Sequence, residues 1–501
     1  MSLLGVDVGT TGTKAVAFNL EGEAIASAYR EYPLLSPRPG WLELDARKVG
    51  KAVLDVVREV ASKTKHDPIR ALSVSCQGEA TVPVSRDGEV LYNTPISFDS
   101  RTDDLAKWWA ERMSREEAFG ITGMPLHPMH TIFKILWIRE HEPEVFRKVW
   151  KFLCYEEYVF YLLGLEPTTD YSLAARTMAF DVRKKAWSER ILSVAGLPED
   201  IFPKVVPSGT AVGEVPRKRA EELGLPEGVL AVTGGHDQPC NALGSGVVRE
   251  EVAAYGVGTV ECITPAFGEV PRPERLLSHN FACYPHVAPG LWVTLAFNFT
   301  GGSLLRWYRD NFGEKEREEA GRLGTDPYDL ILSDLPEGPT GLLVLPHFTA
   351  TGTPHFDVHS KGVVMGLTLS TSRKEFVKAL LEGVTMEMRL NLELLEEAGV
   401  QVRKLRLTGG GAKSAVWAKI KADILGRSIS TLHVSEATSL GTAILAGVAL
   451  GEYSSVEEAA NGLVRVKETF EPDPKLHEVY TERFELYKEI YPRLKDILHE
   501  V

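Results

Sequence analysis

A short run of glycine and threonine near the N-terminus is the first feature of this sequence that could do chemistry. The run Asp7–Lys14 reads DVGTTGTK and follows an apolar stretch. A turn of small residues between two strands lets backbone N–H groups converge, and such a concavity binds phosphate oxygens. Gly9 and Gly12 would allow a ligand to come close, while Thr10 and Thr11 add hydroxyl donors. The pattern indicates a phosphate-binding turn, with a plain hairpin turn as the alternative.

Charged residues flank this turn on both sides. Asp7 ends the predicted first strand, where a carboxylate could hold Mg²⁺ through water, because magnesium favours one or two carboxylates together with substrate phosphates. Lys14 could add a positive charge near the phosphates. The turn is not a Walker A loop, since no GxxxxGK[ST] pattern opens a helix here. The alternative for Asp7 is a solvated side chain beside the turn.

A second run of the same kind lies half a chain away. YGVGTVE, Tyr255–Glu261, repeats the strand, Gly-Thr turn and strand, with Gly258 and Thr259 in the turn. Either turn alone would read as a hairpin. Two matched turns favour a clamp on the phosphates of a nucleotide, and a cleft between two domains is a common ligand position.

A third candidate lies in GGHDQPCNALGSG, where Asp237 follows an apolar strand and two glycines. A carboxylate at that point could accept a hydroxyl proton during phosphoryl transfer. The alternative is an Asp that only caps the following helix. His236 and Gln238 are either neighbours of the substrate or buried turn residues.

Three consecutive glycines form the fourth candidate. LTGGGAKSAVWAKIKADILG places Gly409, Gly410 and Gly411 between a predicted strand and a helix. Side-chain-free backbone leaves room for a flat group such as a purine. A simple strand–helix turn is the alternative reading.

Length and composition restrict what elements can position these residues. The chain has 501 residues, 44% of them apolar and 25% charged, and this size predicts two soluble domains. The net charge of −13 argues against nucleic acid as a partner. The five cysteines show no CxxC spacing, and no stretch is long and apolar enough to span a membrane or to serve as a secretory signal. We therefore expect a cytoplasmic protein without a membrane partner.

The order of predicted elements indicates an α/β protein. The chain opens with a β-meander, and valines then recur at helical spacing over residues 46–63. A long helical region is expected over 101–163 and a strand-rich patch over 169–182. Helices are predicted for 374–398, 415–425 and 439–451. Because the two Gly-Thr turns echo each other, we place a domain boundary near Gly246, which gives domains 1–245 and 246–501.

Taken together, six segments resemble the FGGY carbohydrate kinases, in that family's order and over nearly the whole chain. They are DVGTTGTK, PGWLELD, GGHDQ, YGVGTVE, LTGGGAKSAVWAKIKADILGR and EATSLGTAILAGVALG. The resemblance implies two domains of the actin, hexokinase and Hsp70 ATPase type, which is a ribonuclease H-like fold. It also implies ATP and Mg²⁺ in the cleft between the domains and a small-molecule sugar as substrate.

The resemblance also implies a role for each candidate residue. Asp7 would be the carboxylate on the magnesium side and Asp237 the catalytic base. The remaining nucleotide-side positions would be the first phosphate loop (Gly9, Thr10, Thr11, Gly12, with Lys14), the second (Gly258, Thr259), the adenosine platform (Gly409, Gly410, Gly411) and an approach to the nucleotide at Gly301 and Gly302.

Substrate-side candidates come from two further segments. SVSCQGEATVPV offers Gln77 and Glu79, whose alternative is a solvated strand end, and FDSRT offers Asp99 and Arg101. Buried polar side chains of this kind discriminate substrates through hydrogen bonds left unmade. His236 and Gln238 complete the substrate-side set.

The choice of substrate stays open at this point. TPHFD, WLELD and TDYSLAARTMAFD resemble stretches of xylulokinases and favour a ketopentose, xylulose or ribulose. Gly78 and the GGHDQ segment depart from that pattern, so a glycerol, other polyol or aldonate kinase is the alternative. An actin- or Hsp70-like ATPase acting by conformational change is a second alternative, although the tail 470–501 is too short for a peptide-binding domain. The helix expected over 475–500 is either a homodimer surface or a solvated helix.

Overall fold

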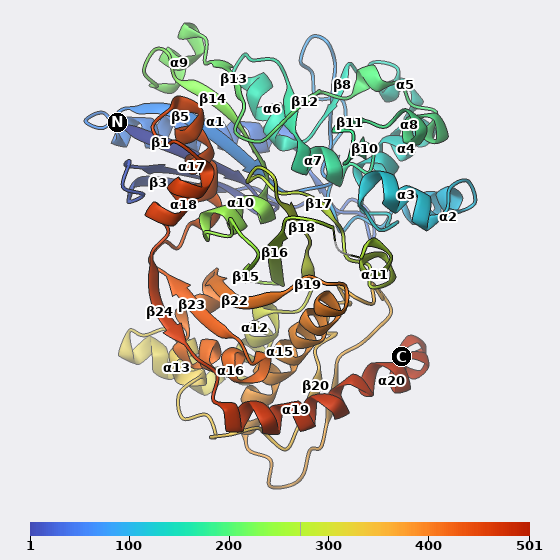
Figure 1. Cartoon of the computed structure of the whole chain (residues 1–501), viewed down its shortest axis with the longest axis vertical. Helices are drawn as coiled ribbons and strands as arrows, with labels where there is room; N and C mark the ends of the chain where they lie inside the picture. The colour runs from blue at the N-terminus through green and yellow to red at the C-terminus, as the bar shows by residue number, and fades with distance from the viewer. Residues whose placement is uncertain (271) are drawn as a thin grey trace.

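The computed structural model describes residues 1–270 and 272–501. Figure 1 shows two lobes stacked along the long axis, with the first half of the chain in the upper lobe and most of the second half in the lower lobe. Each lobe is built on one mixed β-sheet flanked by helices. We call them lobe 1 and lobe 2.

The sheet of lobe 1 has six strands in the order β13-β14-β5-β1-β2-β3. Strands β1, β5 and β14 run parallel, whereas β2, β3 and β13 are antiparallel to their neighbours. Parallel strands buried on both faces read as nearly continuous apolar runs, as the sequence SLLGVDV of β1 does. The strand bounds are β1 Ser2–Val8, β2 Gly12–Phe18, β3 Ala24–Glu31, β5 Ile69–Cys76, β13 Ala211–Glu214 and β14 Leu230–His236.

Helices cover both faces of this sheet. Helix α1 (Ala46–Lys63) buries the valine stripe predicted from the sequence and is capped by the side chain of Asp45. On the other face lie α10 (Asp237–Gly244) and α17 (Ala437–Leu450), which pack against each other and the sheet. In Figure 1 the red α17 stands among the blue strands of lobe 1. A helix from the second half of the chain therefore completes the first lobe, whereas the C-terminus lies in the lower lobe (Figure 1).

The α10–α17 contact is very close. A Cβ added at Gly244 would lie 1.7 Å from the carbonyl oxygen of Ala437, and one at Gly441 would lie 2.0 Å from that of Cys240. No side chain fits at either glycine without separating the helices. This contact fixes the start of α10, where Asp237 lies.

The sheet of lobe 2 repeats the plan of lobe 1. Its order is β17-β18-β16-β15-β22-β23-β24, and β19 also pairs with β16. Strands β15, β22 and β23 are parallel, and β16 and β24 are antiparallel to their neighbours. The strand bounds are β15 Glu251–Val257, β16 Glu261–Phe267, β17 Tyr284–Pro285, β18 Trp292–Val293, β19 Ala296–Asn298, β22 Val402–Thr408, β23 Ser428–Leu432 and β24 Val466–Phe470. The predicted α/β fold with two related domains is confirmed.

The remaining elements surround the two sheets. In lobe 1 and at its rim these are β4 Glu43–Leu44, β6 Val82–Val84, β7 Thr94–Pro95, α2 Asp103–Ala110, α3 Arg115–Thr122, α4 Thr131–His141, α5 Pro143–Phe146, β8 Lys151–Leu153, α6 Tyr155–Leu162, β9 Thr168–Asp170, α7 Tyr171–Arg176, β10 Phe180–Asp181, β11 Ala186–Trp187, α8 Glu189–Ala195, β12 Lys204–Val206 and α9 Arg217–Leu223. The others are α11 Pro273–Ser278, α12 Gly302–Phe312, α13 Glu314–Leu323, α14 Pro327–Ile331, β20 Leu343–Leu345, β21 Val363–Met365, α15 Arg373–Glu397, α16 Ala415–Leu425, α18 Val456–Leu463, α19 Pro474–Lys488 and α20 Ile490–Glu500.

Two of the sequence predictions need correction. The long helical region predicted over 101–163 is five shorter helices with strand β8 between them. The patch predicted as strand-rich over 169–182 has the short strands β9 and β10 at its ends and helix α7 between them. The Asp170 side chain accepts hydrogen bonds from the backbone N–H groups of Ser172 and Leu173, which starts this helix. The three helices predicted in the last third match α15, α16 and α17 closely.

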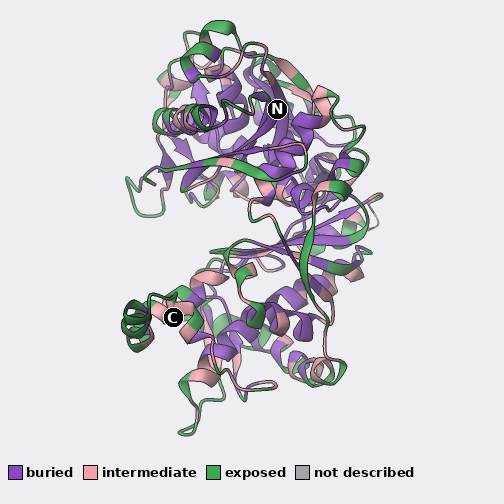
Figure 2. Cartoon of the chain, turned by 90° about the vertical axis from the view of Figure 1, so that its left-hand side faces the viewer, coloured by how far each residue is buried: buried purple, intermediate pink, exposed green. Residues whose placement is uncertain are grey.

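Buried apolar residues form a core around each sheet, and Figure 2 shows the strands of both lobes as mostly buried. Leu3 and Val16 of the lobe 1 sheet share a core cluster with Ile444, so α17 is part of the core of lobe 1. Among the described residues, no helix is long and apolar enough to cross a membrane.

Candidate functional site

A cavity of about 260 Å³ lies between the lobes and contains both predicted carboxylates. Asp7 near the end of β1 and Asp237 at the start of α10 line it from lobe 1, together with Gln238. The ends of β15 and β22 line it from lobe 2 with Gly258 and Gly409. Strand ends from both sheets therefore meet at one point, as the sequence predicts for a ligand cleft.

The Asp7 carboxylate is stabilised by one hydrogen bond and perturbed by burial. Ser75 of the neighbouring strand β5 donates its hydroxyl to Asp7 Oδ1 at 2.8 Å. Burial raises the pKa of Asp7 to about 6, with a further contribution from the negative charge of Glu436, while Ser75 and Lys14 oppose the shift. A carboxyl that is costly to ionise here would gain from a cation placed beside it.

Asp237 is more strongly perturbed. Burial raises its pKa to about 8, and the negative charges of Asp7 and Glu79 add to the shift. Its side chain is still 28% exposed, and Oδ1 lies 3.2 Å from Nε2 of His236. A carboxyl whose proton affinity is high, and which is open to a cleft, has the properties of a general base.

The first Gly-Thr turn is held by neutral hydrogen bonds. Gly9 N–H donates to the Gly12 carbonyl at 3.0 Å, and the Tyr32 hydroxyl donates to the Gly9 carbonyl at 2.5 Å. Thr10 donates its hydroxyl to Oε1 of Gln77 at 2.8 Å. Gln77, a predicted substrate residue, therefore directs its amide oxygen to the phosphate turn. Thr11 is exposed at its tip.

The second turn is held from two directions. Gly301 N–H donates to the Thr259 carbonyl at 3.0 Å, and Gly302 N–H donates to the Gly258 carbonyl at 2.8 Å. Within the turn, Gly258 N–H donates to the Val260 carbonyl at 3.0 Å, and both Gly258 and Thr259 are exposed. The structure thus brings Gly301 and Gly302 behind the second turn.

The glycine triplet packs against the same turn. Gly409 has φ +82°, and a Cβ added there would lie 2.7 Å from the Val257 carbonyl oxygen. A Cβ at Gly411 would lie 2.2 Å from a Val257 methyl group, whereas one at Gly410 would meet open space. Gly409 and Gly411 are therefore required for close packing, and Gly410 lies at the exposed surface.

Lys14 forms a contact that sequence reasoning missed. Its ammonium lies 2.7 Å from Oε1 of Glu436, and the two side chains are 34% and 32% exposed. Glu436 precedes α17 and also lines the cavity. The motif EATSLGT contains this glutamate, but nothing local in the sequence relates it to position 14.

A buried charge cluster lies on the substrate side. Glu79 forms an ion pair with Arg176 of α7 and accepts a hydrogen bond from Ser97 at 2.8 Å. Lys134 of α4 donates to the Glu79 carbonyl at 2.7 Å. Burial alone would raise the pKa of Glu79, but Arg176, together with smaller contributions from His236, His130 and Lys134, lowers the pKa to about 2.

Glu79 is therefore a buried, ionised residue, whereas its alternative reading was a solvated strand end. It has φ +63°, in the left-handed region that a residue with a side chain seldom adopts. Arg176 was missed in the sequence, although it lies within the stretch TDYSLAARTMAFD. Its role depends on a partner 97 residues earlier in the chain, so no local pattern could have found it.

Asp99 and Arg101 pair with each other. The guanidinium of Arg101 donates to both oxygens of Asp99 at 2.7 Å, and it also meets Oε1 of Glu43 at 2.7 Å. It stacks over the Trp41 ring, with 4.0 Å to the ring centroid. The carboxylates of Asp99 and Glu43 thus hold Arg101 against the segment around Trp41. Neither Asp99 nor Arg101 lines the cavity with Asp237.

The two carboxylates of the cavity suit Mg²⁺ bound together with phosphate oxygens. Within the described part of the chain, no group of three or more His, Cys, Asp or Glu side chains is placed to hold a metal by itself. Asp7 and Asp237 share one small cavity, and the negative charge of Asp7 makes ionisation of Asp237 more costly. One or two carboxylates completed by phosphate oxygens and water is how proteins hold Mg²⁺.

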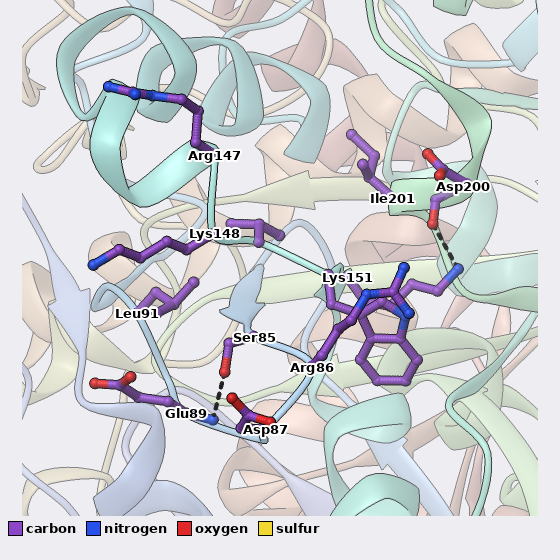
Figure 3. Close-up of a pocket in the computed structure, with 12 residues that line it drawn as sticks. Ser85, Arg86, Asp87, Glu89, Leu91, Arg147, Lys148, Lys151, Asp200 and Ile201 are labelled. Atoms are coloured by element: carbon purple, nitrogen blue, oxygen red, sulfur yellow. Dashed lines mark hydrogen bonds between the residues drawn. The ribbon is translucent and has the colours of Figure 1, made fainter.

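A larger hollow lies elsewhere on lobe 1. Figure 3 shows its lining, which includes Arg86, Arg147 and Lys148 and shares no residue with the cleft. Lys151 at its edge donates to the Asp200 carbonyl at 2.7 Å, and Arg147 pairs with Glu144. Positive and negative side chains alternate around the hollow, so its charge selects no ligand class.

Two lobes of the same β-sheet plan, with two Gly-Thr turns and two carboxylates at the cleft between them, define a nucleotide-dependent phosphotransferase. The family model "FGGY family of carbohydrate kinases, N-terminal domain" matches residues 2–244, and the corresponding C-terminal domain matches 253–450. The chain belongs to the FGGY family of carbohydrate kinases, and the family predicted from its motifs is confirmed.

Named relatives agree on the reaction class and differ in substrate. A xylulose kinase from Bacillus subtilis is 29% identical over 99% of this chain and 97% of its own. An autoinducer-2 kinase from Salmonella paratyphi B is 30% identical over 98% of this chain and 94% of its own. A solved gluconate kinase from Lactobacillus acidophilus has a TM-score of 0.89 at 25% identity, covering 98% of each chain. The chain is thus a carbohydrate kinase whose relatives carry several substrate names.

Proposed function

We propose that this enzyme transfers the γ-phosphate of ATP to a hydroxyl group of a neutral ketose, a ketopentose such as xylulose or ribulose. The observation that carries the proposal is the meeting of Asp7, Asp237 and the lobe 2 glycines in one cavity between the lobes. Phosphoryl transfer depends mainly on positioning, charge neutralisation and one proton acceptor, and these residues can provide all three.

In this proposal, each group acts at a stated atom. The carboxylate of Asp237 accepts the proton of the attacking hydroxyl, and the backbone N–H groups of the two turns position the phosphates. Asp7 holds Mg²⁺ through water, and the ion neutralises phosphate charge when bound. Gly409–Gly411 give the adenosine an unobstructed surface.

The charges on the substrate side favour a neutral sugar over an aldonate. Recognition of a substrate carboxylate needs a cation free to pair with it. Among the described residues near Glu79, both Arg176 and Lys134 already bind Glu79 itself. Burial lowers the pKa of His127 to about 4 and that of His130 to about 3, so both imidazoles are neutral at pH 7.

The charged groups that act on the cavity, apart from these paired cations, are mainly negative. Asp7, Asp237 and Glu79 all act on the same cavity, since the charges of Asp7 and Glu79 both raise the pKa of Asp237. An anionic substrate would meet this field before any metal complex neutralised it. Neutral hydroxyl groups can instead use Glu79 and Asp237 as acceptors.

The experiment is ADP formation measured against a panel of ketopentoses, ketohexoses, glycerol and gluconate. We expect turnover that depends on sugar, with a ketopentose giving the largest kcat/KM and gluconate at least tenfold less. Gluconate as the best substrate would overturn the charge argument. ADP release that ignores every sugar would favour the alternative of a conformational ATPase.

A variant tests the base separately. Asp237→Asn keeps the size of the side chain but removes the proton acceptor, and we expect turnover to fall by about 10²–10⁴-fold while ATP still binds. Sugar phosphorylation at the wild-type rate would show that Asp237 is not the base. The domain boundary near Gly246, a cytoplasmic location and a homodimer remain predictions.

A further inference from the structure

Three polar side chains lie in a row that crosses from lobe 2 to the proposed base: Tyr284 and His236 share a hydrogen bond, and His236 lies close to Asp237. Tyr284 belongs to β17 of the lobe 2 sheet, and its hydroxyl lies 3.0 Å from Nδ1 of His236. Nε2 of the same imidazole lies 3.2 Å from Oδ1 of Asp237. Tyr284 and His236 are both buried, so neither can exchange its partner for bulk water without moving.

The hydrogen-bonding capacity of the partners limits where the imidazole proton can lie. When Asp237 is ionised, as a base must be before it accepts a proton, its carboxylate can only accept, so a neutral His236 that donates to it carries its proton on Nε2. Nδ1 is then the acceptor for the Tyr284 hydroxyl. The imidazole is neutral because burial lowers the pKa of His236 to about 3, and the charge of Arg176 adds to this shift.

The absence of a side chain at Gly78 leaves room for the His236 ring beside Asp237. A Cβ added at Gly78 would lie 3.0 Å from Nε2 and 3.1 Å from Cδ2 of His236, closer than nearly all real Cβ contacts. The backbone N–H of His236 is held by the hydroxyl of Ser172 at 2.9 Å. Gly78 and the GGHDQ segment both depart from the xylulokinase pattern. The two departures therefore belong to one arrangement, in which the imidazole of His236 fills the volume that a side chain at position 78 would use.

We propose that His236 is a positioning residue that orients the Asp237 carboxylate toward the attacking hydroxyl, and that Tyr284 of lobe 2 fixes the tautomer that allows it. The inference rests on the proposed role of Asp237 as base and adds two residues that act through it. Because Tyr284 comes from the other lobe, the orientation of the Asp237 carboxylate depends on contact between the lobes.

Other charged groups also act on this row and must be separated from it. Asp7 and Glu79 raise the pKa of Asp237, and Arg176 opposes them. Glu79 and Arg176 also act on His236, in opposite directions. The test variants therefore leave these three residues unchanged.

The experiment compares pH profiles of kcat/KM, with ADP formation as the assay. His236→Leu removes the donor to Asp237, so the ionised carboxylate is less stable and the acid limb should move to higher pH. We expect kcat to fall 10- to 100-fold and KM for the sugar to change less than threefold. His236→Gln keeps an N–H donor near the position of Nε2 and should restore at least half of the lost shift.

Tyr284→Phe removes a single oxygen and serves if His236→Leu does not fold. Without its hydroxyl the imidazole can carry its proton on Nδ1, so the acid limb should move in the same direction by a smaller amount. The matched control is His286→Leu, another buried histidine, whose Nε2 faces the Val247 carbonyl at 2.9 Å. We expect its acid limb to stay at the wild-type position.

The outcomes separate this inference from the proposed function. Loss of activity in Asp237→Asn, together with an unmoved acid limb in both His236→Leu and Tyr284→Phe, would overturn the positioning role alone. Full activity in Asp237→Asn would remove the base and this inference with it. An acid limb that moves equally in His286→Leu would show a general effect of packing and would also overturn the role of His236.

Discussion

The two Gly-Thr hairpins occupy equivalent places in the two sheets but present different chemistry to the cleft. Each joins the first parallel strand of its sheet to an antiparallel partner. Two positions before the first turn glycine, the β1–β2 hairpin has Asp7 and the β15–β16 hairpin has Gly256. The scaffold is therefore duplicated, whereas the carboxylates belong to lobe 1 alone.

The supports beneath the hairpins differ as well. The first is held by neutral hydrogen bonds, one that Thr10 donates to Gln77 and one that Tyr32 donates to the Gly9 carbonyl. Under the second, Lys421 of α16 donates to both oxygens of Glu261 and to the Tyr255 hydroxyl, each at 2.8 Å, and both charged side chains are fully buried. In the proposed mechanism the cleft carboxylates of lobe 1 act in catalysis, whereas the buried ion pair of lobe 2 holds backbone in place.

Among the variants that compare the two hairpins, removal of the Asp7 carboxylate should give the largest effect. We expect Asp7→Asn to lower kcat by about 10²–10³-fold, on the scale of losing one charge-stabilising group, and to raise the magnesium concentration needed for half-maximal activity. The lobe 2 control is Gly256→Ala, since a Cβ there would have no neighbour nearer than 3.8 Å, and it should lose less than tenfold. An unchanged magnesium titration in Asp7→Asn would contradict the assignment.

The same variant should be more stable than the wild type at high pH. The folded-state pKa of Asp7 is raised from 3.8 to about 6, so the folded enzyme binds this proton more tightly than the unfolded chain does. Stability from this group is present below pH 3.8 and is lost as pH rises through about 6. Asp7→Asn has no such loss, and its melting temperature relative to wild type should rise between pH 5 and pH 8 in the absence of ligands.

The second-largest effect should come from the support of the lobe 2 hairpin. Lys421→Met leaves Glu261 buried without its partner, which costs about 3–5 kcal/mol of unfolding free energy. The double variant Lys421→Met with Glu261→Gln removes both charges and should recover most of that loss. Denaturant unfolding of the three variants measures both values. Equal stability of the single and double variants would show that Glu261 finds another partner.

How much the sequence predicts depends on whether a feature is local. Short motifs predict the turns at Gly9–Gly12 and Gly258–Thr259, and together they resemble those of the family. The periodicity of the valines predicts helix α1. The position of α17 does not, because a glycine-rich apolar helix at 437–450 reads the same whichever sheet it covers. Helix α7 was missed because the capping role of Asp170 is visible only once Ser172 and Leu173 are seen to bond to it.

The substrate side is the part least accessible from sequence. Glu79 was a candidate from its motif, but its partners Arg176 and Lys134 lie on helices far along the chain. Tyr284 comes from the other lobe. A buried charge can be interpreted only with its partner, and tertiary contacts decide which partner it has. Asp99 and Arg101 differ from Glu79 in this respect, because these two candidates lie two positions apart in the sequence and pair with each other.

A smaller effect should follow from weakening the neutral support of the lobe 1 hairpin. Thr10→Val removes the hydroxyl that donates to Gln77 while keeping the shape of the side chain. A hydrogen bond of this kind contributes about 0.5–1.5 kcal/mol, so the unfolding free energy should fall by about 1 kcal/mol and KM for ATP should rise several-fold. Thr13→Val is a contrasting variant, since its hydroxyl bonds to the Asp7 carbonyl within the hairpin. An unchanged KM for ATP in Thr10→Val would contradict the role of this hydrogen bond.

The smallest effect is expected from the ion pair that joins the two parts of lobe 1. Lys14 and Glu436 are each about one third exposed, and partly exposed pairs contribute about 0–1 kcal/mol and weaken with salt. Lys14→Met should therefore change the unfolding free energy by less than about 1 kcal/mol, and 1 M salt should remove most of the difference. If Lys14 leaves Glu436 to meet the phosphates when ATP binds, Lys14→Met raises KM for ATP while Glu436→Gln lowers it. A rise of the same size in both variants would show that the pair acts as a structural unit and that Lys14 does not reach the nucleotide.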